Sequence, residues 1–177
     1  MNIADAQREM RESYVNAAPG QAISAAFWLA SACCGTWLSV RSAVLALIFG
    51  GALLFPLTVL LCRAVRPRAS VSASNPLRPL APFVALAGPA ILPLAAITLL
   101  YRPAWFYPSI MVIMGAHYVP FAFLYGRRAF LVLGALLVTA GFALACVSGV
   151  PFTLGAWLGA AMLAVFAVLS LPRPISS

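Results

Sequence analysis

Six long apolar segments constrain the fold of this chain more than any other feature of its sequence. Each has about 20 residues, enough for a helix rising 1.5 Å per residue to cross about 30 Å of hydrocarbon. Because the segments are continuously apolar and about twice as long as a membrane β-strand, we expect helices rather than barrel strands. They comprise Gln21–Val40, Ser42–Cys62, Leu80–Tyr101, Trp105–Gly126, Ala129–Ser148 and Phe152–Leu171, with Arg41 expected to mark a tight turn between the first two.

Composition supports the same fold class. Of the 177 residues, 64% are apolar and only 8% are charged, whereas soluble domains are about 45–50% apolar and about 25% charged. This balance excludes a typical cytosolic enzyme, a nucleic-acid-binding domain and a disordered tail. We therefore predict an all-α integral membrane bundle of six transmembrane helices at residues 20–177, preceded by a cytoplasmic N-terminal segment at residues 1–19.

The arginines predict how the chain is threaded, because basic residues accumulate on the cytoplasmic side of a membrane. With six crossings, only Arg41 and Arg102 lie on the far side, and the other nine of the 11 arginines share one side with both termini. We expect both termini in the cytoplasm and the protein in a bacterial inner membrane. The arginines at the ends of apolar segments suit lipid headgroups rather than nucleic acid; they are Arg63, Arg66, Arg68, Arg127 and Arg128.

The first 18 residues differ from the rest because they contain all three acidic residues of the chain. Ile3, Ala6, Met10 and Tyr14 fall on one helical face, which is compatible with a helix lying on the inner membrane surface. A frayed polar tail is the alternative.

A six-residue pattern occurs in the second and the fourth apolar segment. Residues 51–56 and 115–120 both read Gly-Ala-x-x-x-Pro, and an arginine follows each proline after seven residues. Two segments that cross in the same direction fit the duplication of a helical hairpin. A chance match in a chain rich in Gly, Ala and Pro is the alternative.

The second copy of the pattern contains His117, the only histidine of the chain. A proline within a helix frees the carbonyl four residues earlier, and in lipid that carbonyl needs another partner. We therefore expect a buried ligand site near mid-membrane, with His117 hydrogen-bonded between helices as the alternative. The candidate residues are Gly51, Pro56, Gly115, Ala116, His117, Tyr118 and Pro120.

Several chemical functions lack their residues. No Asp or Glu follows Glu12, and the four cysteines form no CxxC pair. The chain therefore lacks the buried acids of cation transporters, the paired carboxylates of many hydrolases and the clustered side chains of a metal site. It also lacks the phosphate- and dinucleotide-binding motifs. We expect no metal, no cofactor and no catalytic residues.

Part of the sequence resembles a known family. The matching features are Phe55-Pro56, Asn75-Pro76-Leu77, Trp105 with Pro108, and Gly115–Phe121 with Tyr125. In these the chain is similar to small bacterial six-helix membrane proteins classed as a domain of unknown function. The resemblance implies six helices and a bacterial inner membrane, and it implies no activity.

Two functions remain open from the sequence. One is the binding or transport of a neutral, anionic or apolar small molecule, or of a lipid, in a cavity near His117. The other is a structural or accessory subunit that packs against a membrane protein partner, with His117 joining two helices. Membrane lipids are expected partners in both cases, and a homo-oligomer is compatible with both.

Overall fold

Helices make up the regular structure of the chain. The computed structural model describes residues 1–67 and 70–171, and in these residues no strand occurs. Two short 3₁₀ turns, at Val15–Ala17 and Pro103–Trp105, precede α2 and α5. The α-helices of the described chain are α1 (Ile3–Ser13), α2 (Ala18–Trp37), α3 (Val40–Val65), α4 (Leu80–Tyr101), α5 (Phe106–Tyr125), α6 (Ala129–Cys146) and α7 (Leu154–Ser170).

Local sequence explains where several helices begin and end. Asn2 and Ser39 cap the starts of α1 and α3, each accepting a hydrogen bond from the backbone N–H three residues later. Gly126 ends α5 in the left-handed conformation, with φ of 60°, which a glycine adopts without steric cost. The turn between α2 and α3 lies at Leu38 and Ser39, so the expectation that Arg41 marks it is wrong. Arg41 lies in the first turn of α3 because Ser39 provides the cap.

Four segments of the described chain are long and apolar enough to cross a membrane. They are α3, α4, α6 and the stretch Pro103–Tyr125 that contains α5. α7 is apolar but has only 17 residues. α2 has 20 residues and buries polar side chains such as Ser24 and Ser31. In length and composition, these four segments meet the requirements for helices that cross a membrane.

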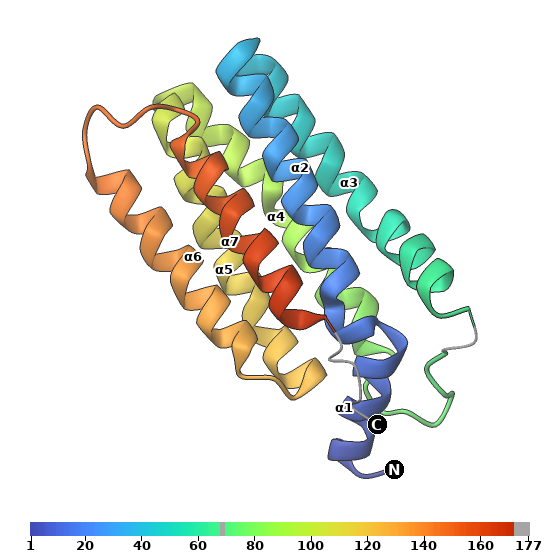
Figure 1. Ribbon diagram of the computed structural model, residues 1–177. Coiled ribbons are helices and arrows are strands. Elements are labelled where there is room, and N and C mark those ends of the chain that lie inside the picture. Colours follow the sequence, from blue (N-terminus) through green and yellow to red (C-terminus); the bar gives the residue numbers. More distant parts are fainter. Residues whose placement is uncertain (68–69, 172–177) are drawn as a thin grey trace.

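The long helices run side by side, alternately up and down, and α1 lies at one end of the bundle (Figure 1). α2 packs between α3 and α7, and α5 packs closely against α6 and also against α4. Large apolar side chains such as Phe83, Leu100 and Phe142 remain exposed on the outside, as a lipid-facing surface requires. The fully buried side chains at the centre include Phe106, Tyr107, Met111, Phe130, Leu133, Leu137 and Leu163.

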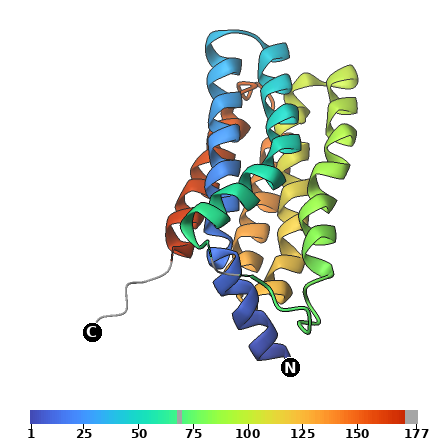
Figure 2. The same ribbon diagram turned by 90° about the vertical axis from the view of Figure 1, so that its right-hand side faces the viewer.

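α3 bends near the middle of its length, and its second half turns away from α4 (Figure 2). Pro56 lies at this place. Its ring clashes with the carbonyl of Ala52, and it lacks the N–H that would bond to that carbonyl, so a bend is the expected result. α3 and α4 consequently make little contact.

α1 covers the end of α5. Ala6 and Met10 are fully buried there. Gln7 Nε2 donates to the carbonyl of Phe123 at 2.6 Å, and Arg11 Nη1 donates to that of Tyr125 at 2.6 Å. These carbonyls belong to the last turn of α5, where donors four residues later in the helix are missing and a positive charge is favoured. The carbonyl of Phe123 also accepts the N–H of Gly126 at 3.3 Å. Residues 3–13 are therefore helical rather than frayed, and a place on a membrane surface stays a prediction.

Glu9 attaches α1 to the loop that leads into α4. Its carboxylate accepts hydrogen bonds from Asn75 Nδ2 at 2.7 Å, from the backbone N–H of Ser72 at 2.8 Å and from Ser72 Oγ at 3.1 Å. These bonds, that of Asn75 above all, hold the pKa of Glu9 below its usual 4.5. Since they favour the ionised carboxylate, this attachment is complete above pH 4.5 and weakens as the pH falls through the lowered pKa.

The turn between α1 and α2 is left-handed at three consecutive residues, none of them glycine. Val15, Asn16 and Ala17 have φ of 51°, 55° and 64°. Each L-residue in this conformation costs roughly 1–2 kcal/mol through its Cβ, although Asn tolerates it better. The turn is therefore a strained element, held in place by the contacts of α1.

Replacing Ala17 by Gly should stabilise the protein by about 1 kcal/mol, because glycine adopts this conformation without the Cβ clash. The neighbouring Ala18→Gly is a matched control, since Ala18 is also buried but right-handed, with φ of −56°. It should destabilise by about 1 kcal/mol. Thermal unfolding in detergent measures both, and shifts of the same sign would contradict a strained turn.

Candidate functional site

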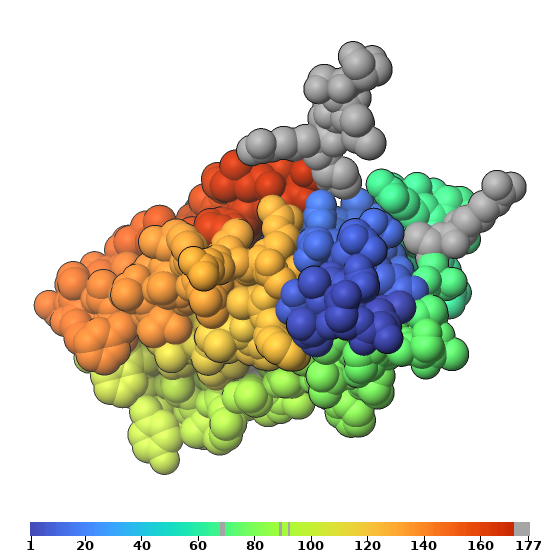
Figure 3. Space-filling view, turned by 90° about the horizontal axis from the view of Figure 1, so that it is seen from below, coloured from blue at the N-terminus to red at the C-terminus, as the bar shows by residue number. Residues whose placement is uncertain are grey.

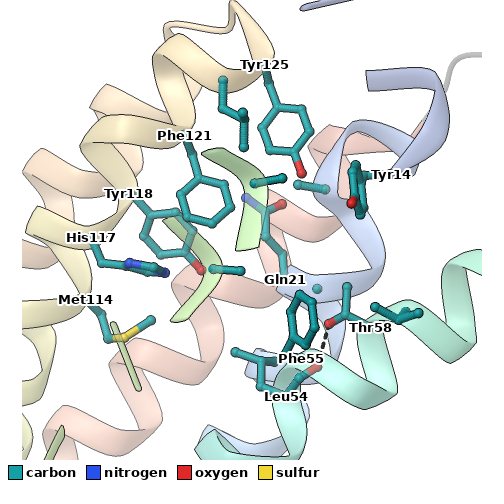
Figure 4. Close-up of a pocket in the computed structure, with 16 residues that line it drawn as sticks. Tyr14, Gln21, Leu54, Phe55, Thr58, Met114, His117, Tyr118, Phe121 and Tyr125 are labelled. Atoms are coloured by element: carbon teal, nitrogen blue, oxygen red, sulfur yellow. Dashed lines mark hydrogen bonds between the residues drawn. The ribbon is translucent and has the colours of Figure 1, made fainter. Parts of the chain in front are cut away.

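The bend of α3 lies beside a partly open cavity inside the bundle (Figure 4). Its volume is about 90 Å³, room for several water molecules or a small organic group. The wall is mostly apolar. It consists of Tyr14 and Ala17 before α2, Gly20 and Gln21 of α2, Leu54, Phe55, Thr58 and Val59 of α3, Ala81 and Ala85 of α4, and Met114, His117, Tyr118, Phe121, Leu124 and Tyr125 of α5.

Only two of the predicted site residues, His117 and Tyr118, line this cavity. Gly115 instead lets α5 approach α6, since a Cβ there would lie 2.6 Å from the carbonyl oxygen of Gly134. Ala116 and Pro120 are exposed on another face of α5. The six-residue pattern therefore does not form one site, because successive helical residues point about 100° apart.

The first copy of the pattern contributes indirectly. Pro56 is exposed on α3 and does not line the cavity, although its neighbour Phe55 does. Gly51 lines a smaller hollow between α2, α3 and α5. Pro56 therefore contributes to the site only by bending α3 beside the cavity.

His117 lies against α4. A Cβ on Gly88 would be 2.9 Å from its Cγ and Cδ2 atoms, so only glycine leaves room for the ring. The imidazole also packs edge-on against Phe121, with ring centroids 5.0 Å apart. Its Nδ1 atom is buried and has no hydrogen-bond partner within the described chain. The contact with α4 is thus one of packing, and one ring nitrogen is left for a ligand or water.

Gln21 is a cavity residue that the sequence analysis missed. It lies near the start of α2, is 2% exposed, and extends into the space bordered by Tyr118, Phe121 and Tyr125 (Figure 4). Its Nε2 and Oε1 atoms both lack a partner in the described chain. The available signal was that Gln21 is the only glutamine in the six apolar segments. A buried amide left unpaired costs about 1–3 kcal/mol.

The polar groups at the cavity are uncharged. Thr58 Oγ1 donates to the carbonyl of Leu54 at 2.7 Å and is already paired. Pro89 has no N–H, so the carbonyl of Ala85 lacks its helical donor. Burial raises the pKa of Tyr14, with Cys62 adding to the shift and Arg78 opposing it, and keeps its hydroxyl protonated. A neutral ligand matches this wall better than an ion.

Metal-binding groups do not gather in the parts of the chain that the structure describes. There, no three of His, Cys, Asp or Glu come close enough to hold an ion.

Four of the five arginines predicted to contact lipid headgroups lie at one end of the bundle. Arg63 and Arg66 end α3, and Arg127 and Arg128 join α5 to α6. In Figure 3 this end shows α1 beside the turn between α5 and α6. Arg68 lies outside the described residues, and lipid contact stays a prediction for all five.

Replacing Gly88 by Ala tests the packing of His117. The added methyl group should clash with the ring and destabilise the protein by about 1–3 kcal/mol. In a His117→Ala background the clash with the ring is absent, and the same change should destabilise much less, since only the local cost of a Cβ in the residue before a proline remains. Unfolding midpoints of the wild type, the two single variants and the double variant measure this coupling. If Gly88→Ala has the same effect with and without His117, the two residues do not touch.

Comparison with known proteins identifies the family. A family model described as "Family of unknown function (DUF7010)" matches residues 3–173. No curated protein and no solved structure matches the chain. The match covers nearly the whole sequence, including every helix that contributes to the cavity. The chain therefore belongs to this family of unknown function.

Proposed function

We propose that the protein crosses a bacterial inner membrane six times and binds a small neutral or apolar molecule in the cavity beside His117 and Gln21. The observation that carries this proposal is the cavity itself, which lies within the bundle and is lined by residues whose buried polar atoms have no partner in the described part of the chain. A cavity lined mainly by apolar side chains with a few convergent polar groups is the usual form of a small-molecule site.

Six crossings are supported by the alternate directions of α2 to α7 (Figure 1) and by the arginines gathered near α1. α2 packs between other helices, and a helix surrounded by protein needs less apolar surface than one in lipid. Transport belongs to the proposal as well as binding, because Pro89 and Pro93 each remove one backbone hydrogen bond from α4, a helix that lines the cavity.

The topology predicts where reporter tags will be found. Tags fused to the two chain ends should both report the cytoplasm, because an even number of crossings returns the chain to its starting side. Ends on opposite faces, or both outside the cell, would overturn six crossings with cytoplasmic termini.

Binding can be tested with a small apolar photoprobe, a trifluoromethyl-phenyl diazirine, added to the protein in lipid nanodiscs. Illumination should label cavity residues such as Phe55 and Met114, detected by mass spectrometry. Ala85→Phe should fill the cavity and reduce this labelling about tenfold, which corresponds to about 1.4 kcal/mol of lost binding energy.

The matched control is Ala87→Phe on the same helix. Ala87 is exposed and does not line the cavity, so its replacement should leave cavity labelling unchanged. Labelling confined to outward-facing residues such as Phe83 and Leu100 would show that the cavity takes no ligand.

That negative result would favour an accessory subunit, for which one surface is suited. α2 and α7 border a shallow apolar hollow of about 260 Å³, and small residues allow another helix to approach closely. In this case His117→Leu should cost only modest stability. The hollow is lined by Ala25, Ala26, Leu29, Trp157, Ala160, Ala161 and Ala164.

A further inference from the structure

The amide of Gln21 is a buried group whose hydrogen-bonding capacity is entirely unused. The side chain is 2% exposed, and both of its polar atoms lack a partner in the described chain. A primary amide presents donor N–H groups and an acceptor oxygen next to each other. In an apolar wall, such a pair is best matched by a group that also donates and accepts.

We propose that the ligand is a neutral amphiphile whose head group both donates and accepts a hydrogen bond, such as a carboxamide, an alcohol or a protonated carboxylic acid, and that Gln21 recognises this head. The inference rests on the proposed function, and it adds the class of ligand and the residue that selects it.

The position of the head group follows from the polar atoms on two helices. Gln21 extends from α2, and His117, with its unpartnered Nδ1 atom, lies on α5 (Figure 4). Among the residues that the structure describes, no Arg, Asp or Glu lines the cavity. A charged head would therefore lose its hydration without gaining a counter-ion, whereas a neutral head exchanges water for the amide.

The apolar part follows from the size and surroundings of the cavity. A volume of about 90 Å³ corresponds to roughly three water molecules at about 30 Å³ each, enough for a small head group and the first carbon atoms of a chain. A longer chain must leave through the wall, and α3 and α4 make little contact beyond the bend at Pro56.

The residues around that exit favour a hydrocarbon chain. Leu54 and Val59 of α3 and Ala85 of α4 line the cavity. The exposed Leu57 and Leu86 of the same helices face outward. The tail therefore runs between α3 and α4 into the bilayer, and the ligand enters from the lipid phase.

Competition with the diazirine probe tests the head group directly. Decanamide and 1-decanol carry heads that donate and accept, methyl decanoate only accepts, and undecane does neither. At equal concentration per lipid, we expect the first two to suppress labelling of Phe55 and Met114 at least about tenfold more strongly than the last two, because a site built for a hydrogen-bonding group discriminates against analogues without it.

Gln21→Leu should abolish this preference while the apolar probe still labels the cavity. The ligand-free variant should also unfold at a higher temperature than the wild type, because an unpaired buried amide has been removed; this excludes misfolding as the cause. Thr98→Val is the control, since the Thr98 hydroxyl is paired with the carbonyl of Ala95 at 2.6 Å outside the cavity, and it should keep the preference.

The outcomes separate the two proposals. If undecane competes as well as decanamide, or if the preference survives in Gln21→Leu, then Gln21 is solvated by water alone and head-group recognition is wrong, although the cavity remains a ligand site. If nothing labels the cavity of the wild-type protein, this inference and the proposed function both fail.

Discussion

A polar group surrounded by hydrocarbon costs several kcal/mol unless it is hydrogen-bonded, and this cost governs both the fold and the candidate site. Gln7 and Arg11 satisfy the last carbonyls of α5. Within the core, Ser31 Oγ donates to the carbonyl of Ala43 at 2.7 Å and lies 2.6 Å from the hydroxyl of Tyr107. Against this background, the unpaired amide of Gln21 and Nδ1 of His117 stand out, and both belong to residues that line one cavity.

The proline of α3 connects the sequence to that cavity. Without Pro56, a straight α3 would continue alongside its neighbours and leave less space next to α4 and α5. The bend removes packing between α3 and α4 and leaves apolar side chains such as Leu57 and Leu86 exposed. A bend in one helix thus accounts for the space beside α4 and α5, and the proposed ligand enters through the weakly packed side between α3 and α4.

Long apolar segments, separated by short stretches with Gly, Pro or Arg, were sufficient to predict the six long helices. Continuous apolar segments of this length form few structures other than helices. They were insufficient for the site. The pattern Gly-Ala-x-x-x-Pro extends around the whole circumference of a helix, so it could not show that His117 and Tyr118 face the cavity while Gly115 faces α6. Gln21 was missed because it stands at the edge of an apolar segment, where a polar residue normally reaches water. Its burial depends on Tyr118, Phe121 and Tyr125 of α5, which lie far away in the sequence.

The strained turn before α2 explains how that burial is maintained. Tyr14, Ala17 and Gln21 all line the cavity, and the left-handed residues Val15 to Ala17 lie among them. A left-handed turn costs free energy, so it persists only if contacts on both sides hold it. On one side, α1 is bound to α5 through Gln7 and Arg11 and to the loop before α4 through Glu9. On the other side, α2 is packed between α3 and α7. The N-terminal helix, which carries every acidic residue of the chain, is therefore part of the structure that places the Gln21 amide in the cavity.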